Sequence, residues 1–449
     1  AAGGGAVKMR AARRAPASRA LAANLLVVGA AALVALLVVE ILLRVLPIRD
    51  PSMVTAFQNP PWEAWSDPAW GNPGPQAYRA EPTIGYEHAP DVDEHVSLRP
   101  HAGGSFHFHT NNLGFRRDSE SRPDKTPGTL RVLVLGDSHT DGYVDNAESF
   151  SSLLETALAR RVGSPPVEVL NAGVVGYSPA QEILWYERHG PALAPDVVLL
   201  VLYAGNDVVE LADPTKPGVD PTTGDARPGP DGSAPAPGKF GPHDRLDALR
   251  VVALTRAAIR FGPLAPLWRR FDLPGAIREV GEFRTDTVSA VLRECHGCFW
   301  QSLLQAAHAE HHPERSRADI DGVAAIAIGL DARVRARGGH TVIAVLPTRA
   351  QVEPALARGE RDRVVALLGL APDSPTFEDE IVEAWVGRFR AAAVDVISLR
   401  EPLREAAAAG AQYYERDWHL GPLGHRTVAA ALADSLTKTL SASSSNARR

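Results

Sequence analysis

The sequence predicts an α/β fold, a three-layer α/β/α sandwich built around a parallel sheet. Short apolar runs alternate along the chain with segments of helical spacing, the pattern of parallel strands joined by crossover helices. The runs are apolar throughout, as expected for strands buried on both faces. The first three runs lead into turns that contain Gly, Asn or Asp, so polar side chains should gather at the carboxyl edge of the sheet, where ligands bind in such folds.

The individual elements follow from these patterns. The expected strands are 131–138, 167–173, 196–207, 340–348 and 394–399. The expected helices are 149–161, 178–190, 322–339, 380–393, 401–410 and 424–440. Gly190 is expected to stop one helix, and Pro402 and Gly410 to begin and cap another.

The N-terminus predicts a membrane anchor. Residues 1–20 form a basic segment, and residues 21–39 are apolar except for Asn24. At about 1.5 Å per residue this run spans roughly 28 Å, close to the hydrocarbon thickness of a bilayer. A cleaved signal peptide is the alternative, but it has a shorter apolar run and a small-x-small site. We therefore expect a single transmembrane helix within 21–46, with residues 1–20 cytoplasmic and the rest extracytoplasmic, beyond the inner membrane.

The remaining chain divides by composition. Residues 47–128 are rich in Pro and aromatics, and the main domain is expected over 129–440. An insertion at 212–320 is too long for an ordinary connection, so a lid or helical cap beside the site is expected. Residues 441–449 are expected to be a disordered tail. The net charge of −6 gives no reason to expect nucleic acid as a partner.

Two histidines alternate with phenylalanines in the stretch "SFHFHT". The alternation predicts a strand with one wet face that carries His107 and His109. Because no carboxylate or Cys accompanies them in the sequence, we predict no metal site there, and no cofactor elsewhere.

Polar residues follow the first three strands. Gly136, Asp137 and Ser138 come directly after the first strand, which places a Ser hydroxyl at the carboxyl edge near a helix N-terminus. Gly173 ends the second strand, and Asn206 with Asp207 ends the third. Backbone N–H groups and an Asn amide at this edge can stabilise an oxyanion. Taken singly, all of them are also ordinary turn and capping residues.

A candidate base lies near the C-terminus, in "YYERDWHLGPLGH". On an extended segment Asp417 and His419 would point the same way, roughly 6.6 Å apart. A carboxylate so placed orients an imidazole and stabilises its charged form. His425 is the rival, but its expected position at a helix N-terminus disfavours the charged form that a base must adopt.

These elements together resemble the SGNH (GDSL-like) hydrolase family, over about residues 130–435. The matches are Ser138 in "GDSHT", Gly173 in "NAGVVGYS", Asn206 in "GNDV" and His419 with Asp417 in "DWHLGPLGH". "TNNLGFRRD" also looks like a segment upstream of the Ser block in membrane-anchored members. His139 departs from the pattern, as does the spacing of Asp417 to His419, which is similar to that of polysaccharide-modifying, membrane-associated members.

The resemblance implies a flavodoxin-like parallel sheet and a serine esterase without cofactor. Ser138 would be the nucleophile, His419 the base and Asp417 its orienting acid. The N–H groups of Ser138 and Gly173 with Asn206 would form the oxyanion hole, supported by Asp137 and Asp207. The expected substrate is an O-acyl ester on a cell-envelope or secreted carbohydrate, with envelope-assembly proteins as further partners. An O-acyltransferase with the same residues and a non-catalytic polysaccharide-binding scaffold remain alternatives.

The chain has 2 Cys residues, Cys295 and Cys298. Outside the cytoplasm a disulfide between them is expected. Free thiols and redox chemistry remain alternatives, whereas zinc would need two further ligands at a typical spacing.

Overall fold

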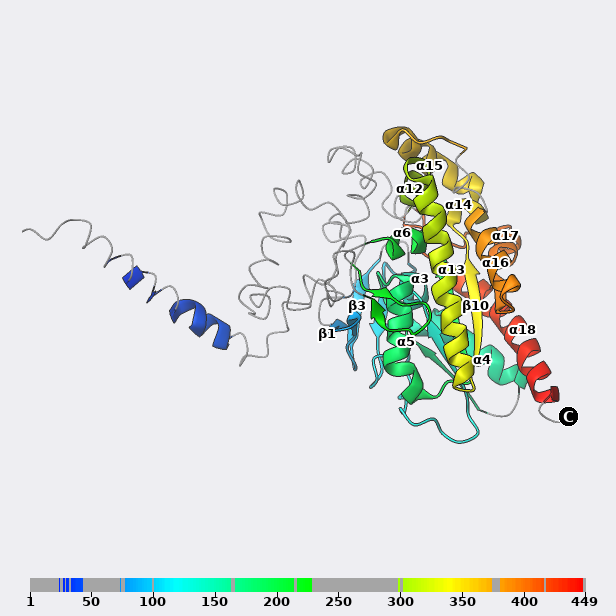
Figure 1. The fold of residues 1–449 in the computed structure, drawn as a ribbon, viewed down its shortest axis with the longest axis horizontal. Coiled ribbons are helices and arrows are strands. Elements are labelled where there is room, and N and C mark those ends of the chain that lie inside the picture. Colours follow the sequence, from blue (N-terminus) through cyan, green and yellow to red (C-terminus); the bar gives the residue numbers. More distant parts are fainter. Residues whose placement is uncertain are drawn as a thin grey trace, which may run out of the picture.

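A computed structural model describes most of the domain predicted from the sequence (Figure 1). The described residues are 24, 27–28, 30–31, 34–42, 73, 77–98, 101–162, 166–213, 216–227, 298, 302–373, 380–415 and 417–446.

A 5-stranded parallel sheet forms the centre of this domain. Its strands are β5 (Leu130–Leu135), β6 (Val167–Asn171), β7 (Val197–Tyr203), β10 (His340–Leu346) and β11 (Asp395–Ser398). Their order across the sheet is β11-β10-β7-β5-β6. The chain therefore reverses its direction of growth between β5 and β7, the flavodoxin-like arrangement in which a ligand crevice opens beside these two strands.

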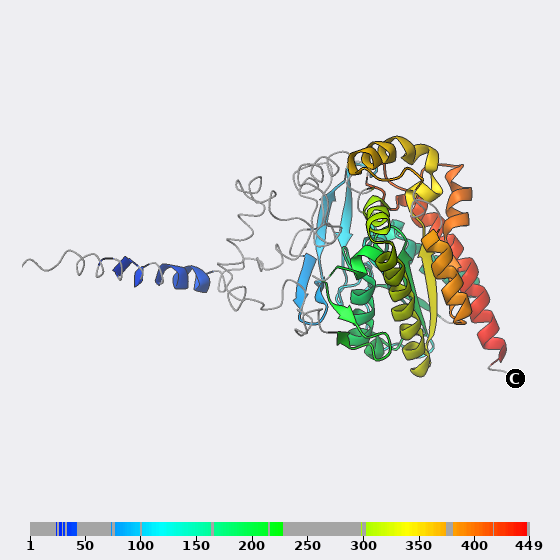
Figure 2. The same cartoon turned by 45° about the horizontal axis from the view of Figure 1, so that its top comes forward.

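Helices cover both faces of the sheet, which confirms the α/β sandwich (Figures 1 and 2). One layer contains α5 (Pro179–Leu193), α13 (Pro313–Ala336) and α16 (Glu380–Ala391), and the other contains α4 (Phe150–Val162), α17 (Arg400–Ala407) and α18 (Pro422–Asn446). Alternate strand residues serve the two layers: Leu133 packs in one core and Val134 in the other. This alternation explains why the strands are apolar at every position.

Shorter elements surround this core. The hairpins are β1 (Tyr78–Glu81) with β2 (Gly85–His88), β3 (Asp93–Ser97) with β4 (Ser105–His109), and β8 (Gly218–Val219) with β9 (Ala226–Arg227). The remaining helices are α3 (Ser138–Asp141), η3 (Asn146–Glu148), α6 (Asp207–Leu211), α12 (Leu304–His311), α14 (Arg349–Val352) and α15 (Pro354–Leu368). In Figure 1, α12, α14 and α15 lie at the same end of the sheet as α3 and α6.

Several predicted boundaries were wrong. Helix α5 does not stop at Gly190 but continues to Leu193, because Ala194 takes the left-handed conformation that ends it. Helix α13 begins at residue 313, inside the expected insertion. Helix α18 runs to Asn446 through part of the expected disordered tail, since no Gly or Pro follows Gly424 to break it.

The predicted anchor is described only in part. Within 21–46, the helical residues described are 24, 27–28, 30–31 and 34–42. Among the residues that the structure describes, no helix is both long enough and apolar enough to cross a bilayer.

Candidate active site

Ser138, His419 and Asp417 form a continuous hydrogen-bonded relay. Ser138 Oγ lies 2.7 Å from His419 Nε2, and His419 Nδ1 lies 2.5 Å from Asp417 Oδ1. A carboxylate on Nδ1 fixes the proton there and leaves Nε2 as the acceptor for the Ser hydroxyl. The His419 and Asp417 side chains are 14% and 15% exposed, so the relay is sheltered yet reachable from solvent.

Ser138 is held at the carboxyl edge by a short turn of helix. Strand β5 ends at Leu135, and Asp137 caps α3 by accepting a hydrogen bond from His139 N at 2.9 Å. Burial raises the pKa of Asp137, and the N–H donated by His139 counteracts part of this effect. The "GDS" sequence thus acts as a cap and as a catalytic element at once.

A turn, and not an extended segment, brings Asp417 and His419 together. Trp418 between them has a φ of 66°, in the left-handed region that residues other than Gly seldom adopt. Trp418 N donates to Tyr414 O at 3.0 Å, and His419 N donates to Asp417 Oδ1 at 3.2 Å. The prediction that Asp417 and His419 lie on an extended segment was therefore wrong, although it selected the same pair of residues.

Packing of the Trp418 indole fixes the position of this turn on the domain. It is fully buried in an apolar cluster with residues of α12 and α15, among them Leu304 and Val364, and with Cys298. Its Nε1 donates to Glu360 Oε2 at 3.3 Å. The end of the predicted insertion thus supports the catalytic turn. Cys298 is disulfide-bonded, and its predicted partner, Cys295, lies outside the described residues.

Two of the three predicted oxyanion-hole donors, Gly173 N and Asn206 Nδ2, already have acceptors. Gly173 lies against α3 so closely that a Cβ there would meet Asp141 N at 2.5 Å, which explains the Gly. Its N–H donates to Asn171 Oδ1 at 3.0 Å. Asn206 Nδ2 donates to Asp137 Oδ2 at 3.2 Å and to Glu210 Oε1 at 3.1 Å.

An acid cluster lies beneath these donors, in which Asp137, Glu182 and Asp207 are buried and Glu210 is half-buried. Burial, followed by repulsion from neighbouring carboxylates, raises the pKa of both Glu182 and Asp207 well above the usual value. Burial also raises the pKa of Glu210 to about 7, despite an ion pair with Lys216 Nζ at 3.0 Å. Asp207 accepts a hydrogen bond from Tyr203 N at 2.7 Å, which ties it to the end of β7.

Arg116 organises the loop after α3, a role that the sequence did not predict. Its fully buried guanidinium donates to Asp141 Oδ1 at 2.8 Å and to the backbone oxygens of Asp141, Gly142 and Val144. Burial opposes ionisation of Asp141, but His88 and Arg116 outweigh it and lower its pKa. This loop carries Tyr143, whose ring centroid lies 4.5 Å from that of His419. In the sequence, the only feature that pointed to Arg116 was its place in the motif "TNNLGFRRD".

Two further histidines lie near the relay and are poor bases. His139 is buried with its ring centroid 4.7 Å from that of His419. Burial, followed by the charges of His419 and His425, lowers its pKa well below the usual value. Burial lowers the pKa of His425 to about 3. His425 Nδ1 accepts a hydrogen bond from Phe150 N at 3.2 Å, a structural role.

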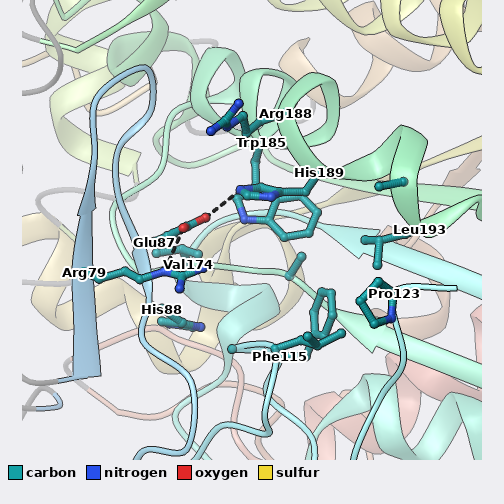
Figure 3. Close-up of a pocket in the computed structure, with 14 residues that line it drawn as sticks. Arg79, Glu87, His88, Phe115, Pro123, Val174, Trp185, Arg188, His189 and Leu193 are labelled. Carbon is teal, nitrogen blue, oxygen red and sulfur yellow. Dashed lines mark hydrogen bonds and ion pairs between the residues drawn. The ribbon is translucent and has the colours of Figure 1, made fainter.

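A separate cavity of about 200 Å³ lies between the β1–β2 hairpin and α5 (Figure 3). Trp185 and Phe115 contribute apolar surface, and Glu87 bonds Arg79 Nε at 2.8 Å and His189 Nε2 at 2.7 Å. Ser138, Asp417 and His419 are not among its lining residues.

Comparison with known proteins adds two family models. Residues 134–323 match the GDSL-like lipase/acylhydrolase family, and residues 303–449 match the SGNH hydrolase-like domain of the acetyltransferase AlgX. Among curated proteins, the chain is 29% identical over 130 residues to the probable alginate O-acetylase AlgJ of Pseudomonas aeruginosa. That match covers 29% of this chain and 30% of AlgJ.

Alignments of the chain with solved structures include an acetylxylan esterase and a lipase/acylhydrolase. The acetylxylan esterase Axe2 of Geobacillus stearothermophilus aligns at a TM-score of 0.35 and 13% identity, covering 68% of this chain and 92% of Axe2. The lipase/acylhydrolase of Enterococcus faecalis aligns at a TM-score of 0.31 and 12% identity, covering 69% of this chain and 96% of the enzyme.

Proposed function

Because the chain belongs to the SGNH (GDSL-like) hydrolase family, we propose that it is a serine esterase that cleaves an O-acyl ester through an acyl-Ser138 intermediate. The observation that carries this proposal is the relay from Ser138 Oγ through His419 to Asp417, at 2.7 and 2.5 Å. Both are hydrogen-bond distances, as expected between a nucleophile and its base and between that base and an orienting acid.

Acylation follows from this geometry. Ser138 Oγ attacks the ester carbonyl carbon while its proton passes to His419 Nε2. The carbonyl oxygen becomes an oxyanion, and Asp417 stabilises the imidazolium. When the intermediate collapses, His419 donates the proton to the departing alkoxide, which leaves as an alcohol. An acyl ester on Ser138 remains.

Deacylation uses the same groups in reverse. His419 takes a proton from water or from an acceptor hydroxyl, whose oxygen attacks the acyl carbon, and then returns it to Ser138 Oγ. Water yields a carboxylic acid, and a sugar hydroxyl yields a new ester. The relay serves both nucleophiles, so hydrolysis and transfer differ only in which of them reaches the acyl group.

The proposed oxyanion donors are Ser138 N–H, Gly173 N–H and Asn206 Nδ2. Preorganised donors of this kind contribute roughly 10²–10³-fold to turnover each. Gly173 N has to release Asn171, and Asn206 Nδ2 has to release one of its two acceptors, Asp137 or Glu210, before each can donate to the oxyanion. The carboxylate that keeps its hydrogen bond then positions the Asn206 amide.

The proposed substrate is an acylated carbohydrate of the cell envelope or a secreted polysaccharide. Support comes from the proteins that the chain resembles, the acetyltransferase AlgX and a probable alginate O-acetylase. The same resemblance favours O-acyl transfer to a sugar hydroxyl as the second candidate.

The proposed location is outside the cytoplasm, with the chain held by one span within residues 21–46. Support comes from the basic segment that precedes the apolar run and from the disulfide at Cys298. A C-terminal reporter that functions only in the periplasm should be active in cells. Activity of a cytoplasm-only reporter instead would contradict this topology.

The activity test uses the full chain with p-nitrophenyl acetate, with and without an oligosaccharide acceptor. Hydrolysis releases acetate and leaves the acceptor unchanged, whereas transfer yields an acetylated oligosaccharide detectable by mass spectrometry. Turnover no faster than that of Ser138→Ala under both conditions would contradict the enzymatic proposal and favour a polysaccharide-binding scaffold.

A further inference from the structure

The outer face of the β3–β4 hairpin gathers one carboxylate and three imidazoles. The strands pair antiparallel, with Asp93 opposite His109 and His95 opposite His107. Alternation sends Val96, Phe106 and Phe108 into the core, so these four polar side chains share the other face. In Figure 1 the hairpin lies at one side of the domain.

The carboxylate that accompanies the two histidines, that of Asp93, lies on the paired strand and is therefore not next to them in the sequence. Asp93 is far from His107 and His109 along the chain, but Asp93 Oδ1 lies 2.7 Å from His107 Nε2. Opposite residues in an antiparallel pair have Cβ atoms roughly 4.5–5.5 Å apart. The premise that His107 and His109 lack an acidic companion was therefore wrong.

The donor atoms of these side chains converge. One ligand atom from each of Asp93, His107 and His109 lies within 4.8 Å of the other two. The rings of His107 and His109 stack with centroids 5.9 Å apart. Within the described part of the chain, the buried Nδ1 of His109 has no hydrogen-bond partner. A metal ion bound at about 2.0–2.2 Å from each ligand atom needs only small side-chain rotations to be enclosed.

The backbone beneath the cluster is fixed. His107 N donates to Asp145 Oδ1 at 2.5 Å, and Asn146 Nδ2 donates to His109 O at 3.1 Å. Both acceptor and donor belong to the loop organised by Arg116, since Arg116 Nε bonds Asn146 Oδ1 at 3.1 Å. The two histidines are therefore presented by a rigid strand, as a preorganised metal site requires.

We propose that Asp93, His107 and His109 bind one divalent transition-metal ion, with Zn²⁺ the best match and water in the remaining position. Imidazole nitrogen with one carboxylate oxygen suits Zn²⁺ better than Mg²⁺ or Ca²⁺, which prefer sites made of oxygen alone. The ion replaces the hydrogen bond between Asp93 and His107 and ties the two strands together.

The site lies behind the catalytic centre and not in it. On the inner face of the same hairpin, the Phe106 ring lies 5.9 Å from that of Tyr143, which in turn contacts His419. The bound ion would hold the strand that supports Tyr143, so its role is structural.

The test measures Zn²⁺ binding to the full chain, freed of any affinity tag and stripped with chelator, by equilibrium dialysis and calorimetry. We expect one ion per chain on the wild type. His107→Ala and His109→Ala should each weaken binding roughly tenfold or more, and the double variant should abolish it. Circular dichroism verifies that the variants are folded.

His340→Ala is the matched control, because His340 Nε2 also bonds a half-exposed carboxylate, Asp395 Oδ2, at 2.9 Å. This variant should bind Zn²⁺ as the wild type does. Binding that persists in the folded double variant, or that is lost equally in His340→Ala, would overturn the proposal. So would a wild-type chain that retains no Zn²⁺ at all.

Discussion

His419 Nε2 lies 2.7 Å from Ser138 Oγ although the two residues are 281 positions apart in the chain. The contact joins the turn after the first strand of the sheet to the turn before the last helix. The predictions below test this contact and the residues that maintain it.

Replacing Ser138 by Ala should leave the fold intact and remove nearly all ester hydrolysis. Losses in nucleophile variants reach about 10⁶-fold in kcat. The matched control is Ser151→Ala, since Ser151 is also buried but lies on α4. Turnover of p-nitrophenyl acetate decides the matter: Ser138→Ala within tenfold of the wild type would exclude Ser138 as the nucleophile.

The two histidines of the C-terminal motif should behave differently. His419→Ala should nearly abolish kcat and leave stability almost unchanged. His425→Ala should mainly lower the melting temperature, because His425 is fully buried and accepts from Phe150 N. Comparing kcat with thermal stability in both variants separates the roles. An inactive, stable His425→Ala beside an active His419→Ala would reverse the assignment.

Asp417→Asn should reduce kcat by about 10⁴-fold with little change in KM. The variant keeps the size of the side chain but loses the charge that fixes the His419 tautomer and stabilises its imidazolium. Asp434→Asn, an exposed acid on α18, serves as the control and should be fully active. A large rise in KM with unchanged kcat would instead assign Asp417 to substrate binding.

Arg116→Met should destabilise the fold by about 3–5 kcal/mol, since it removes the guanidinium that pairs with the buried Asp141 carboxylate. Arg188→Met is the control, because the Arg188 side chain is 63% exposed and 3.5 Å from Glu81. Arg188→Met should lower the free energy of unfolding by less than about 1 kcal/mol. Urea unfolding of both variants measures the difference, and equal losses would contradict the organising role of Arg116.

Glu210 should make stability depend on pH. Its pKa is raised in the folded state from 4.5 to about 7 by burial, so folding favours the protonated form. The stability it contributes is present in full below pH 4.5 and is lost as the pH rises to about 7. Glu210→Gln should lack this part of the decline, whereas Glu383→Gln, an exposed acid on α16, should follow the wild type. Parallel profiles for the wild type and Glu210→Gln would contradict the prediction.

The sequence alone determined the succession of strands and helices along the chain and the residue types at the carboxyl edge of the sheet. Both are local properties: apolar periodicity reports whether a segment is buried on one face or two, and Gly, Asp, Asn and Ser mark the turns. The sequence was therefore sufficient to predict the segments of β5, β6 and β7 and the polar residues that follow them.

Only the tertiary structure decided which groups meet. Trp418 takes its left-handed conformation because its indole is buried among residues of α12 and α15. Arg116 donates hydrogen bonds to Asp141, 25 positions away in the chain, and to backbone oxygens of the same loop. Asp93 joins His107 and His109 only because two strands pair in one register. Such contacts depend on long-range packing and pairing, which residue spacing does not encode, and they set the geometry on which the proposed chemistry depends.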